Sequence, residues 1–288
     1  MLGGFVPPRS NPTARQERLG IELRRMRERA GLTAREAGSL LGTGPIQISH
    51  IEAGRIGVSE ERLRRMALHY RCSDVELVDA LVVMAAERGR RWYDEYRGVL
   101  PQPTLDLAAL EWHASGLQNV QIVHIPGLLQ TEGYMRALFT YLSVDFTPDD
   151  LDAFIEFRMR RQGVLDREDP PRFTAIIHEA ALRMKAGDRA VARRQLDFVL
   201  DNADRPSVSV RVIPFSAEGF AGMGFSMLYA AGPIPQLDTV QVDQVHGIAY
   251  VDAEAQLVYY RECLRIVERS ALDADESRDF IRRIAREL

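Results

Sequence analysis

Apolar residues recur at helical spacing in two short stretches between residues 32 and 55, LTAREAGSLLGTGPIQISHIEAGR. Thr33, followed three residues later by Glu36, has the pattern of a capping box and predicts the start of the first helix. Gly42 predicts a tight turn, and Pro45 stands at the first position of the second helix, where proline is well accepted. The apolar positions of the two helices are Ala37, Leu40, Leu41, Ile48 and Ile51. The segment therefore predicts two short helices joined by a glycine turn.

Two longer amphipathic stretches flank this pair of helices. The upstream stretch is stopped by Gly31, and the downstream stretch begins at Ser59, a good helix cap. Their apolar positions are Leu19, Leu23, Met26 and Ala30 upstream, and Leu63, Met66, Ala67 and Tyr70 downstream. Together with the central pair they predict a compact all-α bundle of about four or five helices over residues 13–72. Residues 1–12 are rich in Gly and Pro and are expected to form a flexible tail.

The rest of the chain alternates between helical and strand-like patterns. Ser73, with Glu76 three residues later, predicts the start of a connecting helix within residues 73–94. Strands are predicted over residues 122–125, 173–178, 207–214, 225–230 and 239–245. Because these strands cluster late in the chain with helices around them, we expect residues 95–288 to form an α+β domain with a mainly antiparallel sheet.

Charge separates the two predicted domains. Through Cys72 the chain has 13 arginines against 7 acidic residues, a net charge of +6. Because the whole chain carries −4, residues 73–288 carry −10. A basic first domain suits contact with phosphates, and an acidic second domain would be repelled by them.

Several classes of protein are disfavoured by what the sequence lacks. Cys72 and Cys263 are too few for a zinc knuckle or a disulfide framework. The first residues lack the pattern of a signal peptide, and no apolar run approaches the roughly 20 residues of a membrane span. We therefore expect a cytoplasmic protein that does not act at a membrane.

No catalytic constellation emerges from the sequence. His178 and Glu179 lack the second histidine that a metalloprotease helix requires. The three glycines of GFAGMGF at residues 219–225 precede a predicted strand instead of opening a helix, which favours a loop over a phosphate cradle. We expect no enzymatic activity, no metal site and no cofactor.

The first domain resembles the phage-repressor and Xre family of helix-turn-helix DNA-binding domains. The segments that carry the resemblance are LRRMRERAGLT, EAGSLLG and ISHIEAGR, followed by the helix that begins at Ser59. In that family the first residues of the second helix, and one residue a turn later, face the bases of operator DNA. The resemblance implies a transcriptional regulator that reads double-stranded DNA in the major groove.

Carried over to this chain, the resemblance assigns the base-facing positions to Pro45, Ile46, Gln47, Ser49 and His50. This chain departs from the family pattern at residues 44–46, where polar residues are usual. Gln47 and His50 are therefore expected to form the hydrogen bonds to bases, while Ile46 offers apolar contact to a thymine methyl group. Arg35 and Arg55, just before and just after this surface, are expected to contact phosphates.

The second domain resembles a domain of unknown function that actinobacterial Xre-type regulators carry behind their helix-turn-helix. WhiJ-like regulators, often described as antitoxin-like, are examples of that group. The resemblance is carried by IPGLLQTEGYMRA, RMRRQGVL, HEAALRM with RRQLDFVL, VSVRVIP and SALDADES. The chain departs from the family near residue 240, where Gln241 and Asp243 replace a Tyr-x-Glu pattern. The resemblance implies a regulatory domain with a protein or ligand input, and no defined reaction.

Two classes of function remain open. In the first, the chain is a DNA-binding regulator that works as a homodimer and receives a signal in its second domain. In the second, it is an antitoxin-like protein whose main task is to hold a partner. The acidic second domain favours a small basic partner protein. The alternative is a small-molecule effector in a pocket lined by Phe215, Phe220 and Phe225, although phenylalanines in such a pattern more often belong to an ordinary core.

Overall fold

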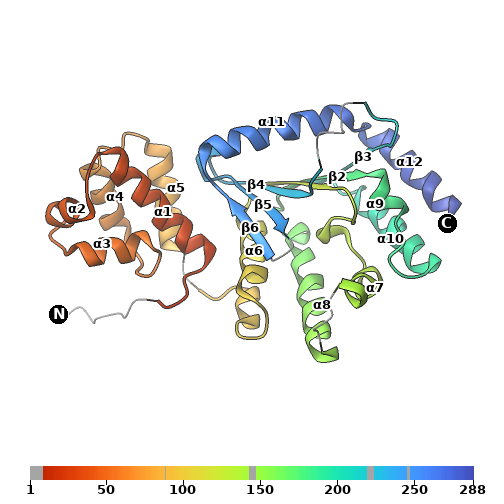
Figure 1. The fold of residues 1–288 in the computed structure, drawn as a ribbon, viewed down its shortest axis with the longest axis horizontal. Helices are drawn as coiled ribbons and strands as arrows, with labels where there is room; N and C mark the ends of the chain where they lie inside the picture. Colours follow the sequence, from red (N-terminus) through yellow and green to blue (C-terminus); the bar gives the residue numbers. More distant parts are fainter. Residues whose placement is uncertain (1–8, 88, 143–146, 219–223, 245–246) are drawn as a thin grey trace. The chain divides into compact units, whose positions relative to one another are not determined.

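The computed structural model covers residues 1–288 and describes all of them except 1–8, 88, 143–146, 219–223 and 245–246 (Figure 1). The chain divides into two compact units. The first unit runs up to Glu95 and includes Gln102–Ala109, and the second contains Tyr96–Pro101 and Leu110–Leu288. The order predicted from the sequence, an all-α bundle followed by an α+β domain, is confirmed.

The first unit is helical throughout its described residues. Its helices are α1 (Ala14–Arg29), α2 (Ala34–Leu40), α3 (Pro45–Glu52), α4 (Glu60–His69), α5 (Val75–Ala86), the 3-10 turn η1 (Trp92–Tyr96) and the first part of α6 (Gln102–His113). Apolar side chains from α1, α3, α4 and α5 are removed from solvent completely: Leu23, Ile48, Leu63, Met66 and Leu81. At about 25 cal/mol per Å² of apolar area, burial of these faces drives the helices together.

Local capping explains where most of these helices begin. The predicted capping box of Thr33 and Glu36 is present, because each side chain accepts the backbone N–H of the other residue. The predicted start of α5 is wrong by one residue. Asp74 is the cap, its carboxylate accepting the Leu77 N–H at 3.0 Å, and Ser73 lies outside the helix. Both residue types are good caps, so their order in the sequence could not decide between them.

The second unit is built on a six-stranded sheet with strand order β3-β2-β1-β4-β5-β6. The strands are β1 (Gly116–Gln121), β2 (Arg172–His178), β3 (Val208–Ile213), β4 (Met227–Ala231), β5 (Thr239–Gln244) and β6 (Gly247–Val251). β1, β2 and β3 pair in parallel, whereas β1–β4, β4–β5 and β5–β6 pair antiparallel. The predicted mainly antiparallel sheet is therefore confirmed, with a parallel half that the sequence pattern did not reveal.

Two strands differ from the sequence prediction. The first strand precedes the apolar run at residues 122–125 and covers GLQNVQ, in which three of the six residues have polar side chains. It is a central strand, paired with β2 on one side and β4 on the other, so backbone pairing specifies it more than apolar alternation does. β6 was not predicted, and its half-buried side chains show why its pattern is weak.

Helices cover both faces of this sheet. Figure 1 shows α11 (Glu254–Ser270) along one face, with α7 (Glu132–Leu142) and α8 (Pro148–Gln162) on the opposite side. Val120, Ile176 and Val240 join Leu257 and Leu264 of α11 in one buried cluster. The other helical segments are η2 (Gly127–Leu129), η3 (Gly163–Asp166), α9 (Glu179–Arg183), α10 (Arg189–Asn202), η5 (Pro235–Leu237) and α12 (Ala274–Glu287). Among the described residues, no helix is long and apolar enough to cross a membrane.

Candidate nucleic-acid interface

The turn between α2 and α3 depends on Gly42. Its φ of +64° lies in the left-handed region, which residues other than glycine adopt only with strain. Its N–H donates to the Ser39 carbonyl at 3.3 Å, and the next N–H, of Thr43, donates to the Gly38 carbonyl at 2.8 Å. The chain thus leaves α2 and enters α3 within a few residues, which holds the two helices at the short spacing of a helix-turn-helix pair.

α3 has one buried and one exposed side. Ile48 and Ile51 are 0% and 2% exposed, so they fix this helix to the bundle. Ile46 is 70% exposed, which leaves a large apolar side chain in solvent at the first turn of the helix. Gln47 and His50 are half-buried along the border between the two sides. Of the three polar residues predicted on the outer side of α3, Ser49 is exposed, whereas Gln47 and His50 are only partly exposed.

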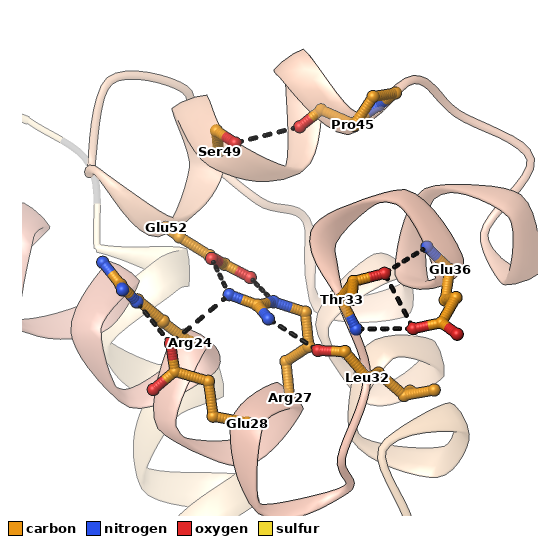
Figure 2. A network of polar contacts seen from close by, with 9 residues as sticks. All are labelled: Arg24, Arg27, Glu28, Leu32, Thr33, Glu36, Pro45, Ser49 and Glu52. Atoms are coloured by element: carbon orange, nitrogen blue, oxygen red, sulfur yellow. Dashed lines mark hydrogen bonds and ion pairs between the residues drawn. The ribbon is translucent and has the colours of Figure 1, made fainter.

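An ion pair that the sequence analysis did not single out connects α3 to α1. The Arg27 guanidinium donates from Nε and Nη2 to the two carboxylate oxygens of Glu52 at 2.6 and 2.8 Å (Figure 2). Both residues are 8% exposed. Arg27 Nη1 also donates to the Leu32 carbonyl at 2.7 Å, which ties in the chain just before α2. The hydrogen bond to Glu52 raises the pKa of Arg27 above its usual value. One buried arginine therefore sets the position of α3 relative to α1 and to the start of α2.

Two of the predicted base-reading residues already make hydrogen bonds within the domain. Ser49 Oγ donates to the Pro45 carbonyl at 3.1 Å, one turn back in the same helix (Figure 2). The Thr43 hydroxyl donates to Gln47 Oε1 in a short contact. The contact orients the Gln47 side chain and leaves its amino group as the hydrogen-bond donor for a ligand. Thr43 is thus a positioning residue that the sequence analysis missed, although its spacing of four residues from Gln47 is visible in the sequence.

The two predicted phosphate contacts lie on exposed ends of the helix pair. Arg35 is in the first turn of α2, and Arg55 follows directly after α3; both side chains are exposed. Within the described part of the chain, neither side chain makes a hydrogen bond or an ion pair. The Arg55 N–H donates to the His50 carbonyl at 2.9 Å, so its backbone is held against the end of α3. Arg9 adds a third basic side chain here, because its backbone N–H donates to the Arg55 carbonyl at 2.9 Å.

The three phenylalanines considered for the second unit have separate surroundings. Phe215 is 62% exposed, and its ring meets the edge of His178 at 5.2 Å between centroids. Phe225 is partly buried against the cluster under α11, with its ring 6.0 Å from that of Tyr260. Phe220 lies outside the described residues. The described residues also contain no group of three or more His, Cys, Asp or Glu side chains that could hold a metal ion.

The residues that replace the family pattern near residue 240 contact each other. Gln241 is 6% exposed, and its Nε2 donates to Asp243 Oδ1 at 2.7 Å. Asp243 itself is exposed at the end of β5. A buried amide is therefore hydrogen-bonded to an exposed carboxylate at the end of β5.

Comparison with protein families gives two matches. Residues 18–81 match a helix-turn-helix domain, which covers α2, α3 and their flanking helices. Residues 104–283, more than half of the chain, match a domain of unknown function, DUF5753. Comparisons with curated proteins and with solved structures find no match to this chain. The first unit is a DNA-binding helix-turn-helix module, and the chain belongs to the family defined by the DUF5753 domain.

Proposed function

We propose that this protein is a sequence-specific transcriptional regulator that reads operator DNA with the exposed side of α3. The observation that supports it most directly is the construction of α3. Ile48 and Ile51 are buried, Arg27 and Glu52 lock the end of the helix, and Gln47 and His50 remain at the border of its exposed side. A helix held this way can enter the major groove without rearrangement.

Each exposed residue of α3 has a chemical role in this proposal. Gln47 presents its amino group, which can donate to adenine N7, and His50 can donate to a guanine acceptor. Ile46 is 70% exposed, so its apolar side chain is in contact with water in the free protein. A thymine methyl group in the major groove offers it an apolar partner. Ser49 keeps its hydroxyl within the helix and contributes through its small size and its remaining acceptor capacity.

The test is a selection of operator sequences from random DNA, followed by affinity measurements on the selected duplex. We expect the double variant Gln47→Ala with His50→Ala to lose about 1–3 kcal/mol for each base contact removed. His69→Ala is the matched control, because His69 also lies in the last turn of its helix, α4. If the double variant binds the selected operator as tightly as the parent while the control also does, this assignment of α3 is wrong.

The proposal includes pairing of two chains. One helix-turn-helix makes few base contacts, and two-fold pairing is the usual way for such a module to gain affinity and select half-sites about 34–36 Å apart. We assign the pairing and the regulatory input to the second unit, which contains most of the DUF5753 match and is called the DUF5753 unit below. We propose that it acts by binding and not by catalysis, as in the Xre-type and WhiJ-like regulators that the sequence resembles. Light scattering of the full chain tests this, since a monomer at micromolar concentration would contradict the pairing.

The second candidate function is that of an antitoxin-like protein that holds a small basic partner. The net charge of −10 after Cys72 supports it, because complementary charge accelerates encounter and rejects wrong surfaces. Pull-down from the native host with the full chain as bait separates the two candidates. Recovery of a small basic protein whose binding abolishes DNA binding would favour the second candidate.

A further inference from the structure

The DUF5753 unit contains two neighbouring arginines in its interior. Arg158 and Arg161 lie on α8; Arg161 is only 4% exposed, and Arg158 is half-buried. Both guanidinium groups face the loop after β1. A Cβ atom added to Gly127 in that loop would lie 2.2 Å from Arg161 Nη2 and 3.1 Å from Arg158 Nη2. Gly127 therefore permits an approach that any side chain would block, and it brings the two cationic groups to the same point.

Nearby carboxylates balance the charge of this pair only in part. Glu111, which is 2% exposed, has one carboxylate oxygen 3.2 Å from Arg161 Nε, but the two atoms do not have hydrogen-bond geometry. Among the described residues, Arg158 makes no ion pair, and its Nε has no hydrogen-bond partner. One buried carboxylate thus faces two guanidinium groups, and the other acidic charge that acts on Arg158 is that of the exposed Asp243. Buried charges are costly unless they are paired, so a second guanidinium without a buried carboxylate partner requires an explanation.

The surroundings of Arg158 orient its guanidinium without neutralising it. Its Nη2 donates to Gln130 Oε1 at 2.9 Å, and its guanidinium carbon lies 4.9 and 5.5 Å from the ring centroids of Phe139 and Phe154. Burial, and then the charge of Arg161, lower the pKa of Arg158 to about 9, so it is still a cation at neutral pH. An arginine held by rings and an amide, with no ion pair among the described residues, is preorganised for a planar anion.

The loop beside the arginines is rigidly held by its own hydrogen bonds. Gln130 Nε2 donates to the Ile125 carbonyl at 2.7 Å, and Gln162 Nε2 donates to the Gln130 carbonyl at 2.6 Å. These amides satisfy the backbone carbonyls of the loop. The arginines are consequently not needed to saturate these carbonyls, and Arg158 contacts the loop through the Gln130 side chain instead of through a backbone carbonyl.

Two further polar groups lie on the side of the sheet away from α11. Asn119 is 7% exposed, its Oδ1 has no hydrogen-bond partner, and it lies on the face of β1 opposite to Val120, which packs under α11. Asn119 is in register with Leu228, which is in register with Gln241. The charge of the exposed Asp243, next to Gln241, reaches both His124 and Arg158. Polar residues on this face of the sheet therefore form a row from the buried Asn119 and Gln241 to the exposed Asp243.

We propose that Arg158 and Arg161 form a binding site for the oxyanion group of a small molecule, a carboxylate or a phosphate, in the DUF5753 unit. Two guanidinium groups at one point match the two or more oxygens of such a group, and the anion balances the excess positive charge. Glu111 competes with the ligand for Arg161. The inference deepens the proposed regulatory function by naming the chemistry of its input, and it favours an anionic ligand even though the unit as a whole is acidic.

Calorimetric titration of the full chain with inorganic phosphate, and separately with succinate, tests the proposal without DNA. We expect saturable binding of at least one probe, and the stronger probe identifies the oxyanion. Arg158→Gln should weaken that binding at least about tenfold, because it removes one charged partner of a buried contact. Glu111→Gln should have the opposite effect and strengthen binding, because it frees Arg161 and removes a repelling carboxylate. This opposite sign is what a merely structural ion cluster does not produce.

The matched control is Arg160→Gln, which removes the same charge from an exposed position two residues along the same helix. It should bind the probe as the parent does, which excludes a general effect of net charge or of salt type. If Arg158→Gln does not fold, Arg158→Lys replaces it, since it keeps the charge but loses the planar fork.

Three results would overturn the site. The first is that parent and Glu111→Gln both bind neither probe. The second is that the Arg158 variant binds like the parent, and the third is that the Arg160 variant loses binding equally. A DNA-binding assay on the parent protein tests the proposed function separately. If the parent binds the anion but selects no operator DNA, the proposed regulatory function is refuted and the anion site is not.

Discussion

The buried ion pair between Arg27 and Glu52 should control the stability of the helix-turn-helix unit. We consider Glu52→Gln, which keeps the shape of the side chain and removes its charge. In the parent, Glu52 accepts two hydrogen bonds from the guanidinium at 2.6 and 2.8 Å, and both residues are 8% exposed. The variant leaves Arg27 charged and buried, with one amide oxygen and the Leu32 carbonyl as its acceptors and the half-exposed Glu28 carboxylate 3.7 Å from its Nη2.

The expected loss follows from the burial of the remaining charge. Removing one partner of a buried pair costs about 3–5 kcal/mol, and the retained amide oxygen places Glu52→Gln near about 3 kcal/mol. Opening of this unit should become roughly a hundredfold more frequent. The double variant Arg27→Met with Glu52→Leu should recover most of the loss, because no unpaired charge then remains in the interior.

Hydrogen exchange of peptides from α1 and α3 in the full chain measures this opening locally, without assuming that both units unfold together. Glu60→Gln is the matched control, because it breaks an exposed ion pair, with Arg64, on helix α4 of the same unit. Surface pairs contribute little, so protection in the control should stay close to that of the parent. A Glu52→Gln variant as protected as this control, or a double variant less stable than the single one, would refute the reasoning.

Three further outcomes test other parts of the structure. Gly127→Ala should displace the Arg161 guanidinium, lower the melting temperature by the equivalent of about 1–3 kcal/mol and abolish phosphate or succinate binding; unchanged anion affinity would contradict the placement of the arginines. Arg35→Gln and Arg55→Gln should each weaken binding to all DNA sequences alike and reduce the salt slope by about one, and an altered sequence preference would contradict a phosphate role. Burial raises the pKa of Tyr70 from 10.0 to about 12. The unfolded phenol therefore ionises first, and the parent should lose stability as the pH rises from 10 to 12. Tyr70→Phe should lose less stability than the parent over this range, whereas Tyr93, whose pKa burial also raises to about 12, keeps its own contribution. Because the Tyr70 hydroxyl has no partner among the described residues, the variant should be no less stable than the parent at neutral pH; denaturant unfolding at both pH values measures this.

The features of the first unit that the sequence predicted are local in the chain. A cap at Thr33, a glycine at residue 42 and a proline at residue 45 act within one helical turn, so they can be recognised without knowing what packs against them. The same holds for the buried positions Ile48 and Ile51, because a helix repeats every 3.6 residues and places them on one side. The sequence by itself therefore determined the existence, order and exposed side of the helix-turn-helix pair.

Contacts between distant residues were decided only by the tertiary structure. Arg27 and Glu52 are 25 residues apart, and an arginine-rich helix offers no sign of which guanidinium becomes buried. The polar strand β1 is recognisable as a strand only once β2 and β4 lie beside it. The pairing of Arg158 and Arg161 with a single carboxylate also depends on the packing of α8 against Gly127 and Glu111. Burial changes the meaning of a charge, because the same side chain that water stabilises at the surface requires a partner in the interior.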